Sequence, residues 1–309
     1  DENIFIYENT KVTSIHDGSP CMVETTGGKV YAKKVVQATH TPLGIYAVHA
    51  EMQAYREFAL AAKIKAPLPE KAVYWYQNDQ QMYSIRPYSF DGNQYLIVLD
   101  DSHLTGHKEQ TEQSFLKVEN FLKAHFEVEE TSYFWAAQNY KPVDELPYIG
   151  TSPVEKNVFI ATGFAADGLV WGTVAASIIA NLISKIEDPL SRTFDPGRFT
   201  PSASFKKFFS ESKNVARNLI NEYLFSKGEK DLRSVNNGEG KIVKIDGEQF
   251  AVFKNEEGKM HIASAVCSHM NCIVHWNSAE KSWDCPCHGS RFSVDGEVLE
   301  GPAINGLKD

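Results

Sequence analysis

Cysteine and histidine side chains gather in two short stretches near the end of the chain. The stretches are CSHMNC at residues 267–272 and CPCHGS at residues 285–290. Each offers a thiol and an imidazole that a tight loop could turn toward one point. Zinc accepts two thiolates and two imidazoles in a tetrahedral site. A [2Fe–2S] cluster accepts the same set, with both cysteines on one iron and both histidines on the other.

The second cysteine of each stretch helps to distinguish a zinc site from a [2Fe–2S] cluster. Cys272 and Cys287 are surplus to a four-ligand zinc site, and they occupy matching positions in the two stretches. Only Cys21 lies elsewhere, so the clustering indicates one metal site in one small domain. The pattern Cys-x-His followed by Cys-Pro-Cys-His-Gly-Ser resembles the Rieske family. The resemblance implies a disulfide between Cys272 and Cys287.

The resemblance also implies the ligands of a [2Fe–2S] cluster. They would be Cys267 and Cys285 on one iron, and His269 and His288 on the other. Neutral imidazoles replace two anionic thiolates in such a site, so the cluster accepts an electron at a higher potential. The family's histidine edge passes electrons onward, and we expect His288 to be the exit.

Two further residues would tune the cluster. Ser290 is expected to donate a hydrogen bond to a cluster sulfur. Phe292 stands where high-potential members of the family carry a tyrosine, so we predict a potential below the respiratory type and above plant-type ferredoxins. The stretch GPAI at 301–304 resembles the family's proline loop over the cluster, with Ile304 in place of the second proline.

The elements around the two stretches are short strands and tight turns. From residue 229 this pattern predicts a small all-β domain. Residues 202–225 place apolar side chains on roughly one helical face beside several lysines, which predicts a helix. We interpret it as a linker helix docked on its own protein; the alternative is a helix lying on a membrane surface.

Composition narrows the function classes. The 309 residues carry a net charge of −9, which argues against non-specific binding to nucleic acid. No run of about 18 apolar residues is present to span a membrane. The chain begins DENIFIYENT without a methionine, within an expected strand.

The first part of the chain mixes strands and helices. Residues 1–39 predict a β-meander, and residues 44–62 have the spacing of an amphipathic helix. Strands are expected within 72–100 and at 131–140, with an amphipathic helix at 109–126 between them. NVFIATGF, followed by an apolar stretch to residue 186, predicts a strand, a glycine turn and a helix.

Three motifs of this part resemble the D-amino-acid-oxidase-like flavoprotein superfamily. They are TGGKVYAKKVVQATH, DELPYIG and NVFIATGFAADGLVWGTVAASIIANLI, in that order. In that superfamily the last motif sets a helix N-terminus against the flavin, where negative charge develops on reduction. The resemblance implies that the FAD-lining residues are Val12, Ala38, Thr39, Gly163, Phe164, Ala165, Ala166, Asp167, Gly168 and Leu169.

The G-x-G-x-x-G fingerprint expected at the start of such a protein is absent from the sequence. We interpret the chain as beginning after the first βαβ unit, so that FAD belongs to the full-length protein. The alternative for the glycine motif is a generic α/β turn without a cofactor.

The sequence offers only a few candidates for residues that contact the substrate. Lys141 and Arg86 are the cations expected to meet an anionic substrate, and Tyr88 and Tyr83 lie on the strand of Arg86. Each could instead be an ordinary surface or core residue. DDSHLTGH at 100–107 could suggest a mononuclear iron site, but its spacing favours a polar loop.

The expected fold is mixed α+β with five segments. These are part of a glutathione-reductase-like FAD-binding domain at 1–43, an antiparallel-sheet substrate domain with helices at 44–142, a return to the FAD-binding domain at 143–195, a linker helix at 196–228 and an all-β Rieske domain at 229–309.

The predicted function is that of an amine- or amino-acid-oxidase-like, FAD-dependent oxidoreductase. Electrons would pass from flavin through the cluster to an external acceptor. The partners would be a small-molecule substrate and an electron acceptor or donor protein. The alternatives are a Rieske carrier on a non-catalytic flavoprotein-like platform and a zinc-stabilised interaction protein. We expect a cytoplasmic location, although a disulfide suggests an oxidising compartment.

Overall fold

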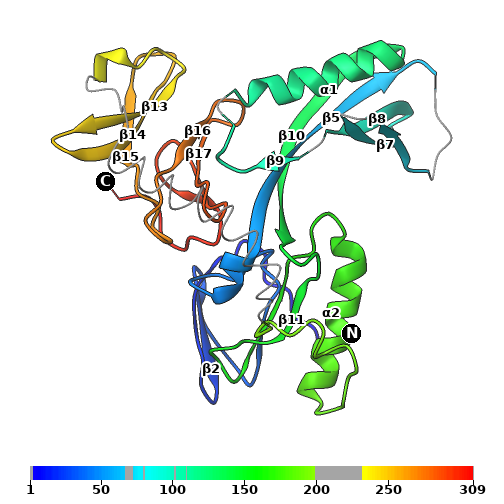
Figure 1. The fold of residues 1–309 in the computed structure, drawn as a ribbon, viewed down its shortest axis with the longest axis vertical. Helices are drawn as coiled ribbons and strands as arrows, with labels where there is room; N and C mark the ends of the chain where they lie inside the picture. Colours follow the sequence, from blue (N-terminus) through cyan, green and yellow to red (C-terminus); the bar gives the residue numbers. More distant parts are fainter. Residues whose placement is uncertain are drawn as a thin grey trace. The chain divides into compact units, whose positions relative to one another are not determined.

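The computed structural model describes residues 3–66, 72–78, 81–100, 102–108, 110–198 and 232–308 (Figure 1). The chain divides into two compact units. The first consists of Asp1–Gln53, Tyr140–Asn214 and Gly301–Asn305, and the second of Ala54–Asn139, Val215–Glu300 and Gly306–Asp309. Two long strands, β5 (Met52–Ile64) and β10 (Val128–Pro142), contribute residues to both units.

The first unit begins with the expected β-meander. The antiparallel sheet contains β1 (Val12–His16), β2 (Cys21–Thr25) and β3 (Gly28–Ala32) in that order. Thr25 pairs with Gly28, so a tight turn joins β2 to β3. Gly28 takes a φ of +135°, a conformation that favours glycine.

The α/β part of the first unit carries the flavin motif. β4 (Val35–Gln37) pairs in parallel with β12 (Val158–Thr162), which pairs antiparallel with β11 (Tyr148–Thr151). The helix α2 (Gly168–Ile183) packs on this sheet through a buried cluster of apolar residues. The cluster includes Ile149, Phe159, Ala161, Ala175, Ile178 and Ile179. The predicted strand, glycine turn and helix are confirmed.

The prediction of a helix over residues 44–62 is wrong. A short 3-10 turn, η1 (Ala47–Glu51), leads directly into β5. Burial alternates from Met52 to Phe58, as in a strand with one buried face, and then becomes continuous to Ala62. The charged Arg56 occupies one of the buried positions, so the apolar pattern of the strand was hidden. Pairing with neighbouring strands overrode the helical spacing.

The sheet of the second unit confirms the other strands expected in this region. Its order is β10-β5-β8-β7-β6, with β8 at Asn93–Leu99, β7 at Met82–Phe90 and β6 at Tyr74–Gln77. β9 (His103–Leu104) pairs with β5. The predicted amphipathic helix is α1 (Glu112–His125), which lies along this sheet in Figure 1. Val118, Phe121 and Leu122 of α1 pack into the core of the sheet.

The C-terminal part is built of strands, as predicted. One sheet contains β13 (Gly240–Ile245), β14 (Glu248–Lys254) and β15 (Met260–Ser264). The second contains β16 (His275–Asn277), β17 (Ser282–Asp284), β18 (Arg291–Phe292) and β19 (Val298–Glu300). The only helical piece in the described residues of this part is the 3-10 turn η2 (Leu232–Ser234).

The predicted linker helix at 196–228 falls almost wholly outside the described residues. Among the residues that are described, no helix has the length and apolar character needed to cross a membrane.

Candidate metal centre and flavin motif

Two loops with the same backbone pattern hold the cysteine and histidine stretches. One loop lies between β15 and β16 and the other between β17 and β18. In the first, Cys267 N donates to Cys272 O at 2.8 Å. In the second, Cys285 N donates to Ser290 O at 2.8 Å. In both loops the closing bond thus joins residues five positions apart.

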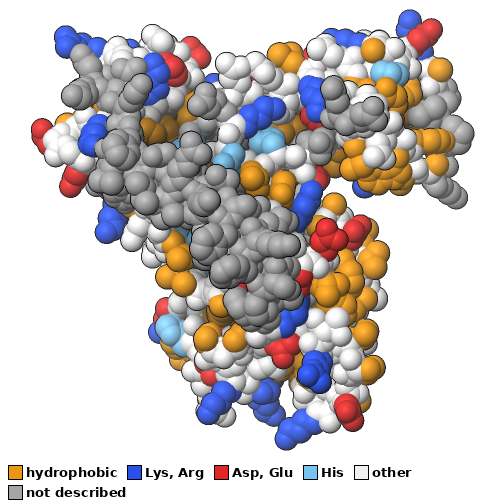
Figure 2. Space-filling view, in the orientation of Figure 1, with side chains coloured by type: hydrophobic (Ala, Val, Ile, Leu, Met, Phe, Trp, Pro, Cys, Tyr) orange, Lys and Arg blue, Asp and Glu red, His pale blue; other side chains and the backbone are white. Residues whose placement is uncertain are grey.

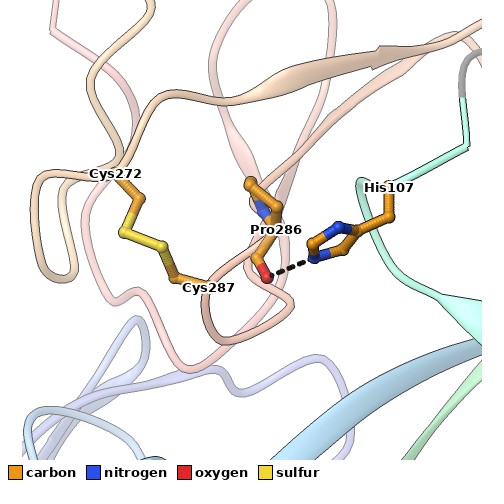
Figure 3. Close-up of a disulfide and its surroundings, with 4 residues drawn as sticks. All are labelled: His107, Cys272, Pro286 and Cys287. Carbon is orange, nitrogen blue, oxygen red and sulfur yellow. Dashed lines mark hydrogen bonds between the residues drawn. A yellow bond between two sulfur atoms is a disulfide. The ribbon is translucent and has the colours of Figure 1, made fainter. Parts of the chain in front are cut away.

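A disulfide joins the two loops, as the resemblance implied. Cys272 and Cys287 are bonded, one from each loop (Figure 3). The sulfur atoms of these two residues and of Cys285 all lie within 4.8 Å of one another. Because two of the three are in the disulfide, Cys285 is the member of this group with a thiol available for iron. The disulfide therefore lies beside a predicted ligand.

The structure brings the four predicted ligands together. Cys267 and Cys285 are buried, outside any disulfide, and hydrogen-bonded to each other through their side chains. The rings of His269 and His288 lie with centroids 5.0 Å apart and nearly perpendicular planes. In both rings the Nδ1 atom is fully buried. This set of two thiols and two imidazoles fits a Rieske cluster, and the assignment of each as a ligand stays a prediction.

The pKa values of three of the four predicted ligands are shifted from their ordinary values. The hydrogen bond from Cys285 lowers the pKa of Cys267 to about 7, and the same bond raises the pKa of Cys285. Burial, together with the neighbouring His269 ring, lowers the pKa of His288 to about 4. His288 is therefore neutral at neutral pH, which is the form that binds a metal.

The two predicted tuning residues are both fully buried beside this centre. The Ser290 hydroxyl makes a hydrogen bond to the Cys267 sulfur, and its expected bond to a cluster sulfur stays a prediction. Phe292 pairs with Trp283 across β17 and β18. A phenylalanine ring has no donor for the cluster, so only the serine can supply a hydroxyl here.

The proline-loop stretch has its own contacts within the first unit. Gly301 O accepts a hydrogen bond from the Tyr140 hydroxyl at 2.9 Å, and Pro302 O accepts one from Gly44 N at 3.3 Å. Ala303 is buried and Ile304 is half-buried. That this loop covers the cluster stays a prediction.

The flavin motif forms a strained turn before α2. Gly163 has a φ of +75°, and a Cβ there would lie 2.7 Å from Pro142 Cγ, so only glycine fits. Ala165 also has a positive φ, 48°, and its N–H donates to Tyr140 O at 3.1 Å. Strain of this kind concentrates at ligand sites. A positive φ also occurs at turns elsewhere in the chain, so the flavin role of this turn stays a prediction.

The start of α2 is exposed although it is apolar. Leu169 is 93% exposed and Val170 is 65% exposed. Hydrophobic side chains also gather on the surface over this helix in Figure 2. Gly168 and Asp167 are exposed as well, so the helix N-terminus is open to a ligand. An apolar surface at such a terminus fits a flavin ring.

The other predicted flavin and substrate residues occupy varied places. Ala38, Thr39, Ala166, Arg86 and Tyr88 are exposed, whereas Val12, Lys141, Phe164 and Ala165 are half-buried. The roles of these residues stay predictions. Tyr83 is instead a core residue, because its ring stacks on Phe121 with centroids 3.9 Å apart.

The described residues of the stretch at 100–107 form the short strand β9 with polar residues around it, where we expected a polar loop. Asp100 accepts a hydrogen bond from Lys117 at 2.7 Å. His103 stacks on Phe58 with centroids 5.4 Å apart. The third candidate, His107, donates from Nε2 to Pro286 O at 3.1 Å (Figure 3). These different partners give no sign of a shared iron site among the described residues of the stretch.

A buried charge network was missed by the sequence analysis. Arg56 of β5 donates to Glu280 at 2.8 Å and to Glu300 at 2.8 Å. Arg291 donates to Glu300 at 2.8 Å and to Asp284 at 2.9 Å. Arg56 is separated from its partners by more than 220 positions, and no local sequence signal predicts such pairs.

Comparison with known proteins decides the family. The model for FAD dependent oxidoreductases matches residues 2–182. The chain belongs to the FAD dependent oxidoreductase family. The model for the Rieske [2Fe–2S] domain matches residues 228–309 of this oxidoreductase. Both resemblances are therefore confirmed, and the two domains indicate FAD and a [2Fe–2S] cluster.

Relatives of this family member have the same or partial architecture. A Bacillus subtilis (strain 168) protein whose name describes a Rieske 2Fe-2S iron-sulfur protein, YhfW, is 33% identical over 98% of this chain. The chain spans 60% of that relative's length. The cytochrome b6-f complex iron-sulfur subunit of Chlorobaculum tepidum is 40% identical over 24% of the chain and 40% of its own length.

A solved structure supports the fold of this oxidoreductase. Glycine oxidase from Geobacillus kaustophilus matches 63% of this chain and 54% of its own chain. The TM-score is 0.50 at 22% identity, so the likeness concerns the fold alone.

Proposed function

We propose that the protein oxidises a small amine or amino acid and passes the electrons singly through a Rieske cluster to an external acceptor. The observation that carries this proposal is the presence of both domains in one chain, the oxidoreductase domain at 2–182 and the Rieske domain at 228–309. In such a fusion, a flavoprotein that removes two electrons from its substrate could pass them one at a time to the cluster.

Residues of this chain would hold the cluster. Cys267 and Cys285 would bind one iron, and His269 and His288 the other. Bound there, the cluster supplies one-electron chemistry at a potential raised by its neutral ligands. The buried Ser290 hydroxyl stabilises negative charge on the Cys267 sulfur and so favours the reduced state.

The turn at 163–168 and the N-terminus of α2 would hold the flavin. Bound FAD supplies a two-electron acceptor for a hydride from a carbon beside nitrogen. Backbone N–H groups at the helix N-terminus favour negative charge on the ring system. Val12, Ala38 and Thr39 would contact the rest of the dinucleotide.

The proposed substrate is an amine or amino acid because the fold neighbour is named a glycine oxidase. Lys141 is half-buried on β10, and Arg86 and Tyr88 are exposed on β7. We assign to Lys141 the role of meeting the carboxylate of such a substrate, and Arg86 is the second candidate for this role. Substitution of either residue by Met would then raise KM for an amino acid more than for an uncharged amine.

The test uses the protein purified with its cofactors. Iron analysis, the flavin absorption spectrum and the EPR signal of the reduced cluster are recorded first. Glycine and sarcosine are then added without oxygen. We expect at least one of them to bleach the flavin and to produce the EPR signal of the reduced cluster.

Other outcomes separate the alternatives. Flavin that bleaches while the cluster stays oxidised would refute the electron relay. A red-brown protein with iron but no flavin would favour a Rieske carrier on a non-catalytic platform. A colourless protein with zinc would favour the interaction protein.

A further inference from the structure

The second cluster loop is held by the oxidoreductase sheet. Gln138 of β10 donates from Nε2 to Gly289 O at 2.8 Å. Gly289 follows the predicted ligand His288 directly in the sequence. The other end of the Gln138 amide accepts a hydrogen bond from the Thr105 hydroxyl at 2.9 Å. Gln138 and Thr105 are buried, so both bonds are shielded from water.

A second contact reaches the same loop from the segment after β9. His107 Nε2 donates to the carbonyl oxygen of Pro286, which lies between Cys285 and Cys287 (Figure 3). The chain approaches Pro286 closely at Gly106 as well, where a Cβ would lie 2.8 Å from Pro286 N. Hydrogen bonds therefore hold the loop at Pro286 and at Gly289, which lie on either side of Cys287 in the sequence.

The cluster loop packs tightly against the sheet at Gly289. A Cβ on Gly289 would lie 2.3 Å from the Cβ of Ala54 on β5. Gly289 also has a φ of +76°, so both space and conformation require glycine. Contacts this close fix the position of the loop relative to the sheet.

We propose that Gln138 and His107 are positioning residues for electron transfer from the flavin to the cluster. This inference rests on the proposed function. The two side chains hold the loop of Cys285 and His288 against the oxidoreductase sheet, so that the cluster stays in place during turnover. The rate of electron transfer falls steeply with the distance between donor and acceptor, so we expect a loop released from the sheet to take up electrons more slowly.

The electrons balance in single steps. In each transfer one electron would leave bound reduced FAD and one would enter the cluster held by Cys267, Cys285, His269 and His288. An external one-electron acceptor would take up that electron before the second transfer. Protons released from the flavin go to solvent. Gln138 and His107 neither accept nor donate electrons, since they act only by holding the loop in place.

The experiment follows electron transfer without a substrate. The complete protein, loaded with flavin and cluster, is reduced with dithionite and freed of excess reductant. It is then mixed with one equivalent of ferricyanide per cluster, which withdraws an electron from the cluster. Re-reduction of the cluster by the flavin is followed by stopped-flow absorbance.

The variants change one hydrogen bond each. In Gln138→Leu and His107→Leu the donor to the loop is removed, and we expect re-reduction to slow by about tenfold or more. His107→Gln keeps a donor near the place of Nε2 and should restore most of the rate. Thr131→Val is the matched control, because Thr131 lies on the same strand β10 as Gln138 and its hydroxyl donates to Glu119 of α1, away from the cluster loop.

Iron content and the EPR signal of the dithionite-reduced cluster separate positioning from cluster assembly. A slowed rate with both of these unchanged supports the proposal, and an unchanged rate overturns it. If Gln138→Leu loses iron, Thr105→Val decides, because it removes only the hydroxyl that orients Gln138. A wild-type protein whose flavin never re-reduces the cluster refutes the proposed function instead.

Discussion

Arg56 Nη1 donates to Glu300 Oε2 at 2.8 Å, although 244 positions separate the two residues. Arg56 lies on the interior strand β5 of the oxidoreductase sheet, and Glu300 ends the last strand of the Rieske domain. The side chain of Arg56 is only 4% exposed, and that of its other partner, Glu280, is 16% exposed. The Rieske domain is thus joined to this sheet by buried charges, in addition to the bonds on its cluster loop.

Removal of Arg56 should destabilise the second unit strongly. Arg56→Met leaves Glu280 and Glu300 facing a single guanidinium in a buried site, and we expect a loss of about 3 kcal/mol in the free energy of unfolding. Urea denaturation monitored by fluorescence measures it. Lys63→Met is the control on the same strand, because the pair of Lys63 with Glu129 is exposed and should cost below about 1 kcal/mol. Equal losses in the two variants would contradict this account.

His103 should make the stability of this unit sensitive to acid. Burial, helped by the nearby Lys108 and Arg56, lowers the pKa of His103 to about 4. His103 therefore takes up a proton near pH 6.5 in the unfolded chain but only near pH 4 in the folded chain. The free energy of unfolding should fall as the pH drops through this window, by at most about 3 kcal/mol from this residue.

His103→Phe tests this pH dependence, because a phenylalanine ring can still stack on Phe58 and does not titrate. We expect the variant to lose less stability than the wild type between pH 6.5 and 4, measured by urea denaturation at each pH. Parallel curves for the two proteins would show that another group is responsible for the acid sensitivity.

The reduction potential of the cluster should respond to Ser290 and Phe292 in opposite directions. Ser290→Ala removes the hydrogen bond to the Cys267 sulfur and should lower the potential by roughly 50–100 mV. Phe292→Tyr adds a hydroxyl at a fully buried position and should raise it. Redox titration followed by EPR measures both shifts. Ser293→Ala, in the turn that binds Glu297 N, is expected to leave the potential unchanged.

Two glycines with nearly equal φ values should respond differently to alanine. Gly106 has a φ of +73° and lies against the backbone of Pro286, whereas Gly92 has a φ of +72° and no atom within 4 Å of its Cβ position. Gly92→Ala should cost only the conformational strain, about 1–2 kcal/mol. Gly106→Ala should cost more and speed the loss of iron, measured by denaturation and by chelator challenge. Similar effects of both would mean that the close approach is unimportant.

Much of the chemistry of the centre could be predicted from the sequence. Two stretches with one thiol and one imidazole each indicated a metal site, and the resemblance to the Rieske family implied a [2Fe–2S] cluster and the disulfide between Cys272 and Cys287 that the structure contains. The turn at Gly163 was also visible, because a strand, a glycine and an apolar helix are local patterns. Local hydrogen bonds and turn conformations fix such features within a few residues.

The support of the cluster loop could not be predicted from the sequence, because it depends on contacts between distant residues. The helix expected over residues 44–62 is largely the strand β5, since pairing on both edges outweighed a helical spacing that Arg56 had disguised. Contacts such as Gln138 with Gly289 join residues 151 positions apart. Polar side chains of this kind look like ordinary surface residues in the sequence. They become specific only when burial removes water and leaves one partner within reach.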